Sequence, residues 1–427
     1  MRVLAVIETD LVEKGPHQTH HLFERLSMNG HEVRIIDYEI NWRRKKRRSL
    51  ISEKIVIKNF HKAIAMSKVI LIRPKIVYIP LLDYASEVFY YGREIFEQIK
   101  LFKPDVIVGF SILNTYIAMK LAKRYNIPFV YYLIDAQHTQ IPETLLKPLG
   151  KFIESLIVQN ADGILVINDE LAKYAARLGG SPEKIHVLRA GIDYGRFNPN
   201  IDGKKTRVKH GIQEDEVVLF FMGWLYTFSG LKEVANSLIN HHGKTKIRLM
   251  VLGKGDLYDE LVKMKSQLGN GLILVDWQPY YKVPEYIAAA DICLLPAYNN
   301  EVMRHIVPIK MYEYMACGKP VIATRLPGIM KEFGEGNGVI YVKNPEDVLG
   351  KVVELTNEKE QIKELGMKAT KYVQKYNWDA ITKRFEEFLL ELIKGKMLRV
   401  KISARYYTAM RSQWYTTSAG AQSSGNP

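Results

Sequence analysis

The segment from Pro308 to Thr324 carries the most specific chemical signal in the sequence. Pro308 suits the first turn of a helix, while Gly318 and Pro320 suit its end and the stop before a strand. Free backbone N–H groups at the start of such a helix, backed by the helix dipole, form a phosphate site that needs no metal ion. The pattern therefore predicts a helix N-terminus that faces a bound phosphate.

Two charged residues of this helix are spaced to bind neighbouring parts of one ligand. Lys310 and Glu313 are three residues apart, which places them on one helix face about 4.5 Å apart along the axis. A cation there suits a diphosphate, and a carboxylate suits the hydroxyl groups of the adjoining ribose. We expect Pro308 and Ile309 to belong to the same site. The alternative is an acid that complements the helix dipole beside a surface lysine.

A second group of candidate residues follows the first predicted strand. Gly15, Pro16 and His17 lie between that strand and the first predicted helix, where glycine permits close approach of the backbone to a ligand. His17 with His20 and His21 raises the question of a metal site. Their spacing places no further ligand, and a helix start with one polar face gives the same pattern. We therefore expect no bound metal.

Asp135 and His138 come directly after the predicted strand Phe129–Ile134, at the edge of a sheet where ligands bind. His138 is a candidate to hydrogen-bond a bound sugar or a developing leaving-group charge. Asp135 is a candidate to hold this histidine or to accept a proton from the second substrate. We treat the two as the catalytic candidates. The alternative is a loop-capping aspartate beside an exposed histidine.

These residues need a scaffold, and the hydrophobic pattern predicts one that is α/β throughout. Buried β-branched runs alternate with apolar residues at helical spacing, which predicts parallel sheets with helices on both faces. The expected strands are Arg2–Ile7, Glu32–Ile36, Val106–Gly109, Phe129–Ile134, Ile164–Ile167, Ile185–Leu188, Val217–Met222, Ile247–Leu252, Leu272–Val275, Ile292–Leu295, Pro320–Ala323 and Val339–Val342.

The alternation stops and restarts once, which predicts two doubly wound, Rossmann-like domains facing across a cleft. We expect the first domain over 1–198 and the second over 199–378, with a linker at Asn200–Gly211. An amphipathic helix over 379–402 is expected to pack back on the first domain, and 403–427 to form a disordered basic and polar tail. Two such sheets offer one ligand site each, which favours a two-substrate enzyme.

Composition excludes several classes of protein. The chain has 427 residues, and its 47% hydrophobic fraction excludes a mostly disordered or collagen-like chain. Two cysteines exclude a disulfide framework and favour a reducing compartment. No apolar run reaches the roughly 18 residues of a membrane helix. Met1–Ile7 is too short for the apolar region of an export signal, so we expect a cytoplasmic protein.

The formal net charge of +15 is concentrated in two places. Six consecutive basic residues run from Arg43 to Arg48, and more follow Glu391 without a balancing acid. Such blocks attract polyanions. Neighbouring aromatic residues such as Trp42 favour the inner, anionic face of a membrane. Aromatic and basic residues together also fit single-stranded nucleic acid, so this pattern alone does not choose between the two. The alternative is a solvated loop and tail.

In their order and spacing, the motifs of this chain resemble those of the family-four retaining glycosyltransferases of the GT-B fold. The motifs are Gly30-His31-Glu32-Val33, Asn160-Ala161-Asp162, Gly191-Ile192-Asp193, Phe221-Met222-Gly223, Val251-Leu252-Gly253-Lys254-Gly255, Val283-Pro284-Glu285-Tyr286 and the helix of Glu313. The resemblance implies transfer of a sugar, with retention, from a nucleotide-sugar donor in the second domain to an acceptor on the first. It implies no cofactor besides the donor, and the absence of an Asp-x-Asp triplet fits a metal-independent site.

The resemblance places Gly223 and Gly253 with Lys310 and Glu313 at the donor, and it exposes three departures. His305 stands where the family commonly has a glutamate. Trp224 and Ser229 stand where it often has an arginine and a lysine that serve the diphosphate. Losing two cations weakens phosphate binding unless Lys310, Arg304 or the helix N-terminus substitutes.

Two hypotheses follow. The favoured one is a retaining glycosyltransferase, peripheral on the inner membrane face, that acts on a lipid-linked or cell-surface glycan precursor. No carboxylate is placed beneath the anomeric carbon, so we expect same-face transfer in which the departing diphosphate helps to deprotonate the acceptor. The alternative is an impaired GT-B scaffold that binds a partner protein or nucleic acid through its basic segments.

Overall fold

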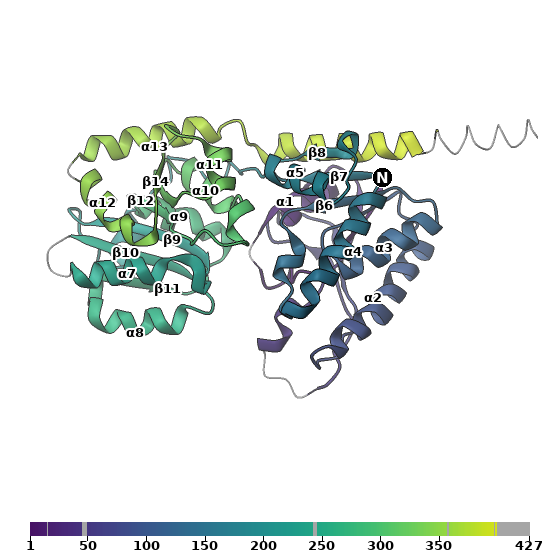
Figure 1. Cartoon of the computed structure of the whole chain (residues 1–427). Coiled ribbons are helices and arrows are strands. Elements are labelled where there is room, and N and C mark those ends of the chain that lie inside the picture. Colours follow the sequence, from purple (N-terminus) through teal and green to yellow (C-terminus); the bar gives the residue numbers. More distant parts are fainter. Residues whose placement is uncertain (15, 45–48, 242–245, 357, 397, 399–427) are drawn as a thin grey trace, which may run out of the picture.

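The structure, a computed structural model, describes residues 1–14, 16–44, 49–241, 246–356, 358–396 and 398. The side chains of Asn41, Arg44, His305 and Lys359 also lie outside the described part. Gly15, most of the basic run and nearly all of the tail therefore lie outside the described residues. The chain folds into two α/β domains, each built around one sheet (Figure 1). This confirms the predicted fold class.

The first domain contains an eight-stranded sheet in the order β3-β4-β2-β1-β5-β6-β7-β8. Its strands are β1 (Arg2–Val6), β2 (Glu32–Ile36), β3 (Ile55–Phe60), β4 (Val69–Arg73), β5 (Val106–Gly109), β6 (Phe129–Leu133), β7 (Gly163–Val166) and β8 (Ile185–Val187). Six of them match the predicted strands to within a residue at each end. Strands β3 and β4 were not predicted, and β3 runs antiparallel to β4, so the expectation of a purely parallel sheet was wrong.

The second domain contains a six-stranded, wholly parallel sheet in the order β11-β10-β9-β12-β13-β14. Its strands are β9 (Val217–Trp224), β10 (Ile247–Lys254), β11 (Leu272–Val275), β12 (Ile292–Leu295), β13 (Val321–Thr324) and β14 (Val339–Val342). The strand order reverses between β9 and β12. Ligands of doubly wound sheets bind beyond the carboxyl ends of the strands at such a reversal.

Helices cover both faces of each sheet (Figure 1). They are α1 (Gln18–Met28), α2 (Leu82–Leu101), α3 (Leu113–Arg124), α4 (Lys147–Asn160) and α5 (Asp169–Arg177) in the first domain, and α7 (Leu231–Asn240), α8 (Tyr258–Leu268), α9 (Val283–Ala289), α10 (Ile309–Ala316), α11 (Pro327–Phe333), α12 (Val348–Thr356) and α13 (Lys359–Val373) in the second. Within the described ranges, no helix is both long enough and apolar enough to cross a membrane.

The segment predicted as a linker contains a helix. α6 (Lys204–Lys209) lies within Asn200–Gly211, and its Arg207 forms an ion pair with Asp291 at 3.1 Å. Gly203, the residue before this helix, lies very close to α9. A Cβ atom at this position would be 2.3 Å from the backbone nitrogen of Ala289. The sequence pattern predicted a linker here and did not predict this helix, one side of which packs on the second domain.

The chain passes between the domains twice, and the two passages lie side by side. Ile192 donates a backbone hydrogen bond to Tyr376 at 2.8 Å and accepts one from Trp378 at 3.2 Å. The second passage leads into a helix over residues 378–396. Phe385 of this helix packs against Phe23 at 5.8 Å between ring centroids, so the helix lies on the first domain.

A buried cluster of charges fixes the loop that follows β1. The Arg73 guanidinium, at the end of β4, binds Asp10 at 2.8 Å and Asp37 at 2.9 Å. The Asp10 carboxylate also accepts the backbone N–H of Glu13 at 2.9 Å, while Asp37 accepts that of Leu11 at 3.3 Å. Breaking such a cluster leaves a buried charge without compensation. The loop is therefore held in one conformation from beneath.

We predict that Arg73→Met lowers the free energy of unfolding by about 3–5 kcal/mol, because it leaves two buried carboxyl groups without their cation. Urea denaturation measures the change. The matched control is Arg93→Met on α2. Its side chain is 70% exposed and forms a surface ion pair with Glu97, so this variant should leave stability nearly unchanged. Equal stabilities of the two variants would show that the cluster contributes nothing.

Candidate functional site

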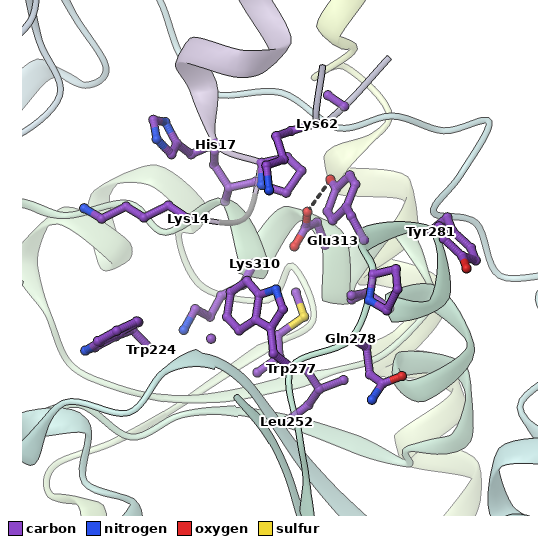
Figure 2. Close-up of a pocket in the computed structure, with 18 of the residues that line it drawn as sticks. Lys14, His17, Lys62, Trp224, Leu252, Trp277, Gln278, Tyr281, Lys310 and Glu313 are labelled. Atoms are coloured by element: carbon purple, nitrogen blue, oxygen red, sulfur yellow. Dashed lines mark hydrogen bonds between the residues drawn. The ribbon is translucent and has the colours of Figure 1, made fainter. Parts of the chain in front are cut away.

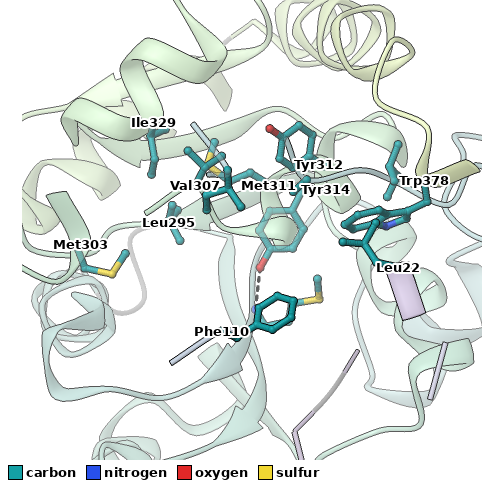
Figure 3. Packing of buried hydrophobic residues seen from close by; sticks show 14 of the residues in the cluster. Leu22, Phe110, Leu295, Met303, Val307, Met311, Tyr312, Tyr314, Ile329 and Trp378 are labelled. Atoms are coloured by element: carbon teal, nitrogen blue, oxygen red, sulfur yellow. Dashed lines mark hydrogen bonds between the residues drawn. The ribbon is translucent and has the colours of Figure 1, made fainter. Parts of the chain in front are cut away.

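Helix α10 is anchored in the core of the second domain, which leaves its first turn at the surface of a cavity. Met311 and Tyr314 are fully buried, and the Tyr314 hydroxyl accepts the backbone N–H of Met222 at 2.9 Å (Figure 3). Pro308 lies just before the helix at its N-cap, one residue outside the predicted first turn. The anchoring therefore fixes where Ile309, Lys310 and Glu313 lie.

Glu313 is buried and bonded. Its Oε1 accepts a hydrogen bond from the Tyr280 hydroxyl at 2.6 Å (Figure 2), and the residue is only 4% exposed. Burial raises the pKa of this carboxyl group to about 7, although Tyr280 and Lys310 pull it down. A carboxylate held in this way costs free energy unless a ligand or a neighbour donates to it. The geometry is suited to receive hydroxyl groups.

Lys310 lies on the same side of the helix as Glu313, as the spacing predicted, and both line one cavity. Its Nζ is 4.2 Å from the centre of the Phe221 ring, and burial lowers its pKa to about 8. An anion bound beside this ammonium group would restore its charge. Lys310 is therefore placed to bind a phosphate.

The cavity lies between the two domains and has a volume of about 740 Å³, within the usual range for a small-molecule site. Figure 2 shows Lys14 and His17 of the first domain on one side, and Lys310, Trp224 and Trp277 of the second domain on the other. The site is therefore composite, as the two-domain prediction required.

Cations from three further segments line the cavity beside Lys310: Lys14, Lys62 and Arg196. Burial lowers the pKa of Lys14, while Asp135 acts on it in the opposite sense. The Arg196 guanidinium lies 4.8 Å from the centre of the Tyr280 ring. The cavity therefore has cations from the first domain and the interdomain passage in addition to Lys310. Of the substitutes named from the sequence, Lys310 lines this cavity, whereas Arg304 is exposed and does not.

The two glycines assigned to the donor site have different roles. Gly223, at φ +123°, lines the cavity, and a Cβ atom there would lie 2.8 Å from the Nζ of Lys310. Gly253 does not line it. A Cβ at Gly253 would lie 1.9 Å from the carbonyl oxygen of Gly223, so this glycine allows β9 and β10 to approach. Gly253 therefore shapes the site from behind.

Aromatic side chains line the cavity on the side of the second domain, where Lys310 also lies (Figure 2). Trp224, Trp277 and Tyr226 all line the cavity. The Lys254 ammonium lies 5.9 Å from the Trp224 ring and 5.8 Å from the Trp277 ring. Flat aromatic faces of this kind accept a base or the apolar face of a sugar. Trp224 thus replaces the charge that the family often has with a stacking surface.

Ser229 does not line the cavity, and the side chain of His305 lies outside the described residues. Ser229 is buried at the end of η5 (Thr227–Ser229), and within the described part its Oγ has no hydrogen-bond partner. The backbone of His305 belongs to η8 (Met303–His305). The assignment of Ser229 and His305 to the donor site stays a prediction.

On the first domain, Pro16 and His17 line the cavity, and Gly15 lies outside the described residues. His17 is the N-cap of α1, and its Nε2 is buried without a partner in the described part of the chain. Burial lowers the pKa of His17, of His20 and of His21. The described residues include no group of three or more potential ligands that could hold a metal ion.

Asp135 and His138 lie beyond the end of β6, as predicted, but they do not contact each other as expected. His138 Nδ1 lies 2.9 Å from Glu154 Oε2 and 2.9 Å from the Tyr174 hydroxyl. Asp135 instead accepts a hydrogen bond from Gln140 at 2.9 Å, and burial raises its pKa to about 6. Neither lines the cavity. Glu154, on α4, holds His138, and no sequence signal connects residues so far apart.

Several residues that lie around Glu313 and Lys310 were missed in the sequence, among them Lys62, Arg196, Trp277 and Tyr280. Tyr280 lies in η7 (Tyr280–Lys282), and its hydroxyl is also 3.5 Å from His21 Nε2 of the first domain. Lys62, Trp277 and Tyr280 come from loops with no recognisable pattern of their own. Only the folded arrangement brings them to the cavity.

Comparison with known proteins agrees with this architecture. Residues 17–196 match the family model described as glycosyltransferase family 4, and residues 216–358 match the model described as glycosyl transferases group 1. A curated relative, the D-inositol 3-phosphate glycosyltransferase of Streptomyces bingchenggensis, is 24% identical over 318 residues, which cover 68% of this chain and 67% of the relative.

Solved structures show the same fold. Sucrose-phosphate synthase from Thermosynechococcus elongatus superposes with a TM-score of 0.73 at 16% identity, covering 92% of this chain and all of that chain. Alr3699/HepE of Anabaena, in complex with UDP-glucose, superposes with a TM-score of 0.68 at 15% identity over the same shares. With matched models on both domains and the GT-B architecture, this chain belongs to the group 1, family-four glycosyltransferases, which transfer sugars from nucleotide-sugar donors.

Proposed function

We propose that this enzyme transfers a sugar, with retention and without a metal ion, from a nucleotide-sugar in the interdomain cavity to a lipid-linked or cell-surface glycan precursor at the inner membrane face. The observation that carries the donor site is the buried Glu313 carboxyl group beside Lys310, on the first turns of a helix whose start faces the cavity. The acceptor class and the membrane face rest on the charge pattern and the apolar surfaces of the first domain.

In the proposed arrangement, the donor diphosphate lies at the start of α10 and pairs with Lys310. The backbone N–H groups there and the positive end of the helix dipole favour this position. The ribose hydroxyl groups donate hydrogen bonds to the Glu313 carboxylate. They either share this carboxylate with the Tyr280 hydroxyl or replace the Tyr280 hydrogen bond. The base stacks in the part of the cavity bounded by Trp224 and Trp277.

Transfer proceeds on one face of the sugar in this proposal. Negative charge grows on the departing diphosphate, and Lys14, Lys62 and Lys310 stabilise it from both domains. The diphosphate then takes the acceptor proton. Asp135 and His138 lie beyond the end of β6 and do not line this cavity, and Glu154 holds the His138 ring, so no step of the proposed transfer is assigned to them and their catalytic role stays a prediction. A trapped covalent glycosyl-enzyme intermediate would contradict this mechanism.

We predict that a UDP-sugar, or failing that a GDP- or ADP-sugar, raises the thermal midpoint of unfolding. A ligand at about 100 times its dissociation constant adds about 2.7 kcal/mol of stability. The order of testing follows Alr3699/HepE, which was solved with UDP-glucose. Glu313→Ala should weaken donor binding about tenfold or more, since a hydrogen bond to a charged group contributes about 1.5–3 kcal/mol.

The matched control for Glu313→Ala is Glu335→Ala. Its carboxylate side chain is 73% exposed and lies away from the cavity lining, so donor binding should be unchanged. If no nucleotide-sugar stabilises the protein, or if Glu313→Ala binds donor as well as the parent protein, the proposed donor site is wrong.

We also predict a bell-shaped pH dependence of donor affinity, measured by calorimetry. The free protein loses the Glu313 carboxylate below its pKa of about 7 and the Lys310 ammonium above its pKa of about 8. Affinity should therefore rise as the pH increases towards 7, pass a maximum, and fall above 8. Glu313→Gln, which cannot ionise, should flatten the acidic limb only. An unchanged acidic limb in that variant would exclude Glu313 as its source.

The membrane part of the proposal has its own test. Charge reversal at positions 44–48, which spares the paired Arg43, should reduce sedimentation with anionic vesicles, and salt should reduce binding of the parent protein. The control reverses the same number of exposed lysines on the second domain: Lys204, Lys205, Lys209, Lys263 and Lys265. Equal binding by the two variants would contradict a specific role for the basic run.

A further inference from the structure

A second cavity, of about 440 Å³, lies wholly within the first domain. Its inner end is formed where β1 and β5 finish, by Glu8, Thr9 and Ser111. This is the point at which the strand order of the first sheet reverses, since β1 lies between β2 and β5. The cavity therefore occupies the ligand position of the first sheet, just as the interdomain cavity occupies that of the second.

Most of the remaining lining is aliphatic or aromatic. The apolar members are Tyr38, Ile40, Trp42, Leu81, Tyr84, Ile112, Leu113, Ile141, Pro142, Leu146, Leu149 and Ile153. Several of these are also exposed: Ile40, Leu81 and Leu149 are 39%, 59% and 54% accessible. Apolar residues that both line a cavity and reach the surface mark its mouth. The second cavity is thus open to an apolar ligand from outside.

The apolar surface continues beyond the mouth on the adjoining elements. Leu145, in η3 (Thr144–Leu146), is 93% exposed, and Phe152, one turn after Leu149 on α4, is 59% exposed. Leu82, next to Leu81 at the start of α2, is 54% exposed. We call Leu81, Leu82, Leu145, Leu149 and Phe152 the apolar lip. Leu81 and Leu149 line the cavity, and Leu82, Leu145 and Phe152 adjoin lining residues in the sequence or on α4. Exposed apolar residues gathered at a cavity mouth mark a site of interaction.

One residue of the lip has a strained backbone conformation. Leu81 has φ +70° and ψ −37°, a conformation that a branched side chain rarely adopts. Strain of this kind persists only where the surrounding structure imposes it, and it is found most often at functional sites. Here it turns a leucine outwards at a cavity mouth, where burial in the protein does not compensate for it.

Charged groups near the mouth are paired or lie away from Leu149. Arg43 lines the cavity and is neutralised by Asp83 at 2.9 Å and Glu143 at 2.5 Å, so it closes one side of the cavity. Lys147 and Lys151 are two residues before and after Leu149 on α4, so they lie on the opposite side of that helix. The mouth itself is therefore apolar, which suits the hydrocarbon part of a lipid.

The inner, polar end of this cavity approaches the interdomain cavity along two segments. The loop after β1 contributes Glu8 and Thr9 to the second cavity, and Lys14, Pro16 and His17 to the first. The turn after β6 contributes Gln137 and Gln140 to the second, while Asp135 on the same turn acts on Lys14. A ligand with a polar head and an apolar chain could therefore place its head towards the donor.

We propose that the second cavity binds the hydrocarbon chain of a lipid acceptor, whose polar head reaches the interdomain cavity along the loop after β1. The occupant enters from the bilayer over the apolar lip, and the chain stays in an apolar environment while its head is presented for transfer. This inference rests on the proposed function and identifies where the acceptor binds and which part of it is recognised.

The test uses photo-crosslinking on the full chain, which does not depend on catalysis. The probes are a diazirine-bearing farnesyl phosphate and a diazirine-bearing dioleoylglycerol, each in vesicles of phosphatidylcholine and phosphatidylglycerol. We expect labelling within residues 137–153, competed by the unlabelled lipid. Labelling by the first probe alone identifies an isoprenoid chain, by the second alone an acyl chain, and by both a site that does not distinguish them. Each of these outcomes supports the proposal.

Two variants separate the cavity from the lip. Leu146→Trp narrows the cavity, and Leu149→Glu places a carboxylate at its mouth. Both should reduce labelling per vesicle-bound molecule by about tenfold, because a charge or a clash in an apolar site easily exceeds the 1.4 kcal/mol that this factor represents. The control is Val208→Glu on α6, which is 80% exposed and lies on the other domain. It should label like the parent protein.

Failure of this inference is distinguishable from failure of the proposed function. Stabilisation by nucleotide-sugars is measured on the same samples. Labelling that is absent, lies elsewhere or is unaffected by Leu146→Trp and Leu149→Glu overturns the lipid site, and it leaves the donor site intact if the nucleotide-sugar still stabilises the protein. Labelling as expected with no stabilisation by any donor would instead refute the donor site alone.

Discussion

The burial of the Glu313 carboxyl group is the constraint on which the site depends. A carboxylate removed from water must be compensated, and the Tyr280 hydroxyl and the Lys310 ammonium group provide the compensation. Tyr280 also reaches His21 of the first domain. The charge state of one residue on α10 is thus tied to the position of the opposite domain, and the interdomain cavity forms around this connection.

Both domains contribute positively charged groups to the lining of the interdomain cavity. The second domain provides the helix start and Lys310, while Lys14 and Lys62 come from loops of the first domain. The loop with Lys14 is held by the buried Asp10, Asp37 and Arg73 cluster, so its cation is presented by a rigid support. The cavity therefore has several cations although Trp224 stands where the family often has a charge.

Much of the fold could be predicted from the sequence because buried parallel strands are continuous β-branched runs. Strand β3 was missed because most of its residues are exposed and its pattern includes Lys58 and Asn59. At the site, Lys310 and Glu313 could be predicted from the sequence because they lie three residues apart on one helix. Lys62, Arg196 and Tyr280 could not, since only tertiary folding brings their separate loops together. Gly253 was predicted to belong to the donor site. It lies directly behind the cavity-lining Gly223 without lining the cavity itself, and its lack of a side chain lets β9 and β10 approach each other.

The paired passages between the domains determine which relative motions the molecule allows. Ile192 is bonded to both Tyr376 and Trp378, so the two covalent connections form one hinge and not two separate tethers. A single hinge permits rotation of one lobe against the other and resists sliding. Because Lys14 and Lys62 lie on one lobe and Lys310 on the other, such rotation changes the spacing of the cations around the interdomain cavity. Opening and closing of the molecule would therefore change how strongly this cavity attracts a negatively charged ligand.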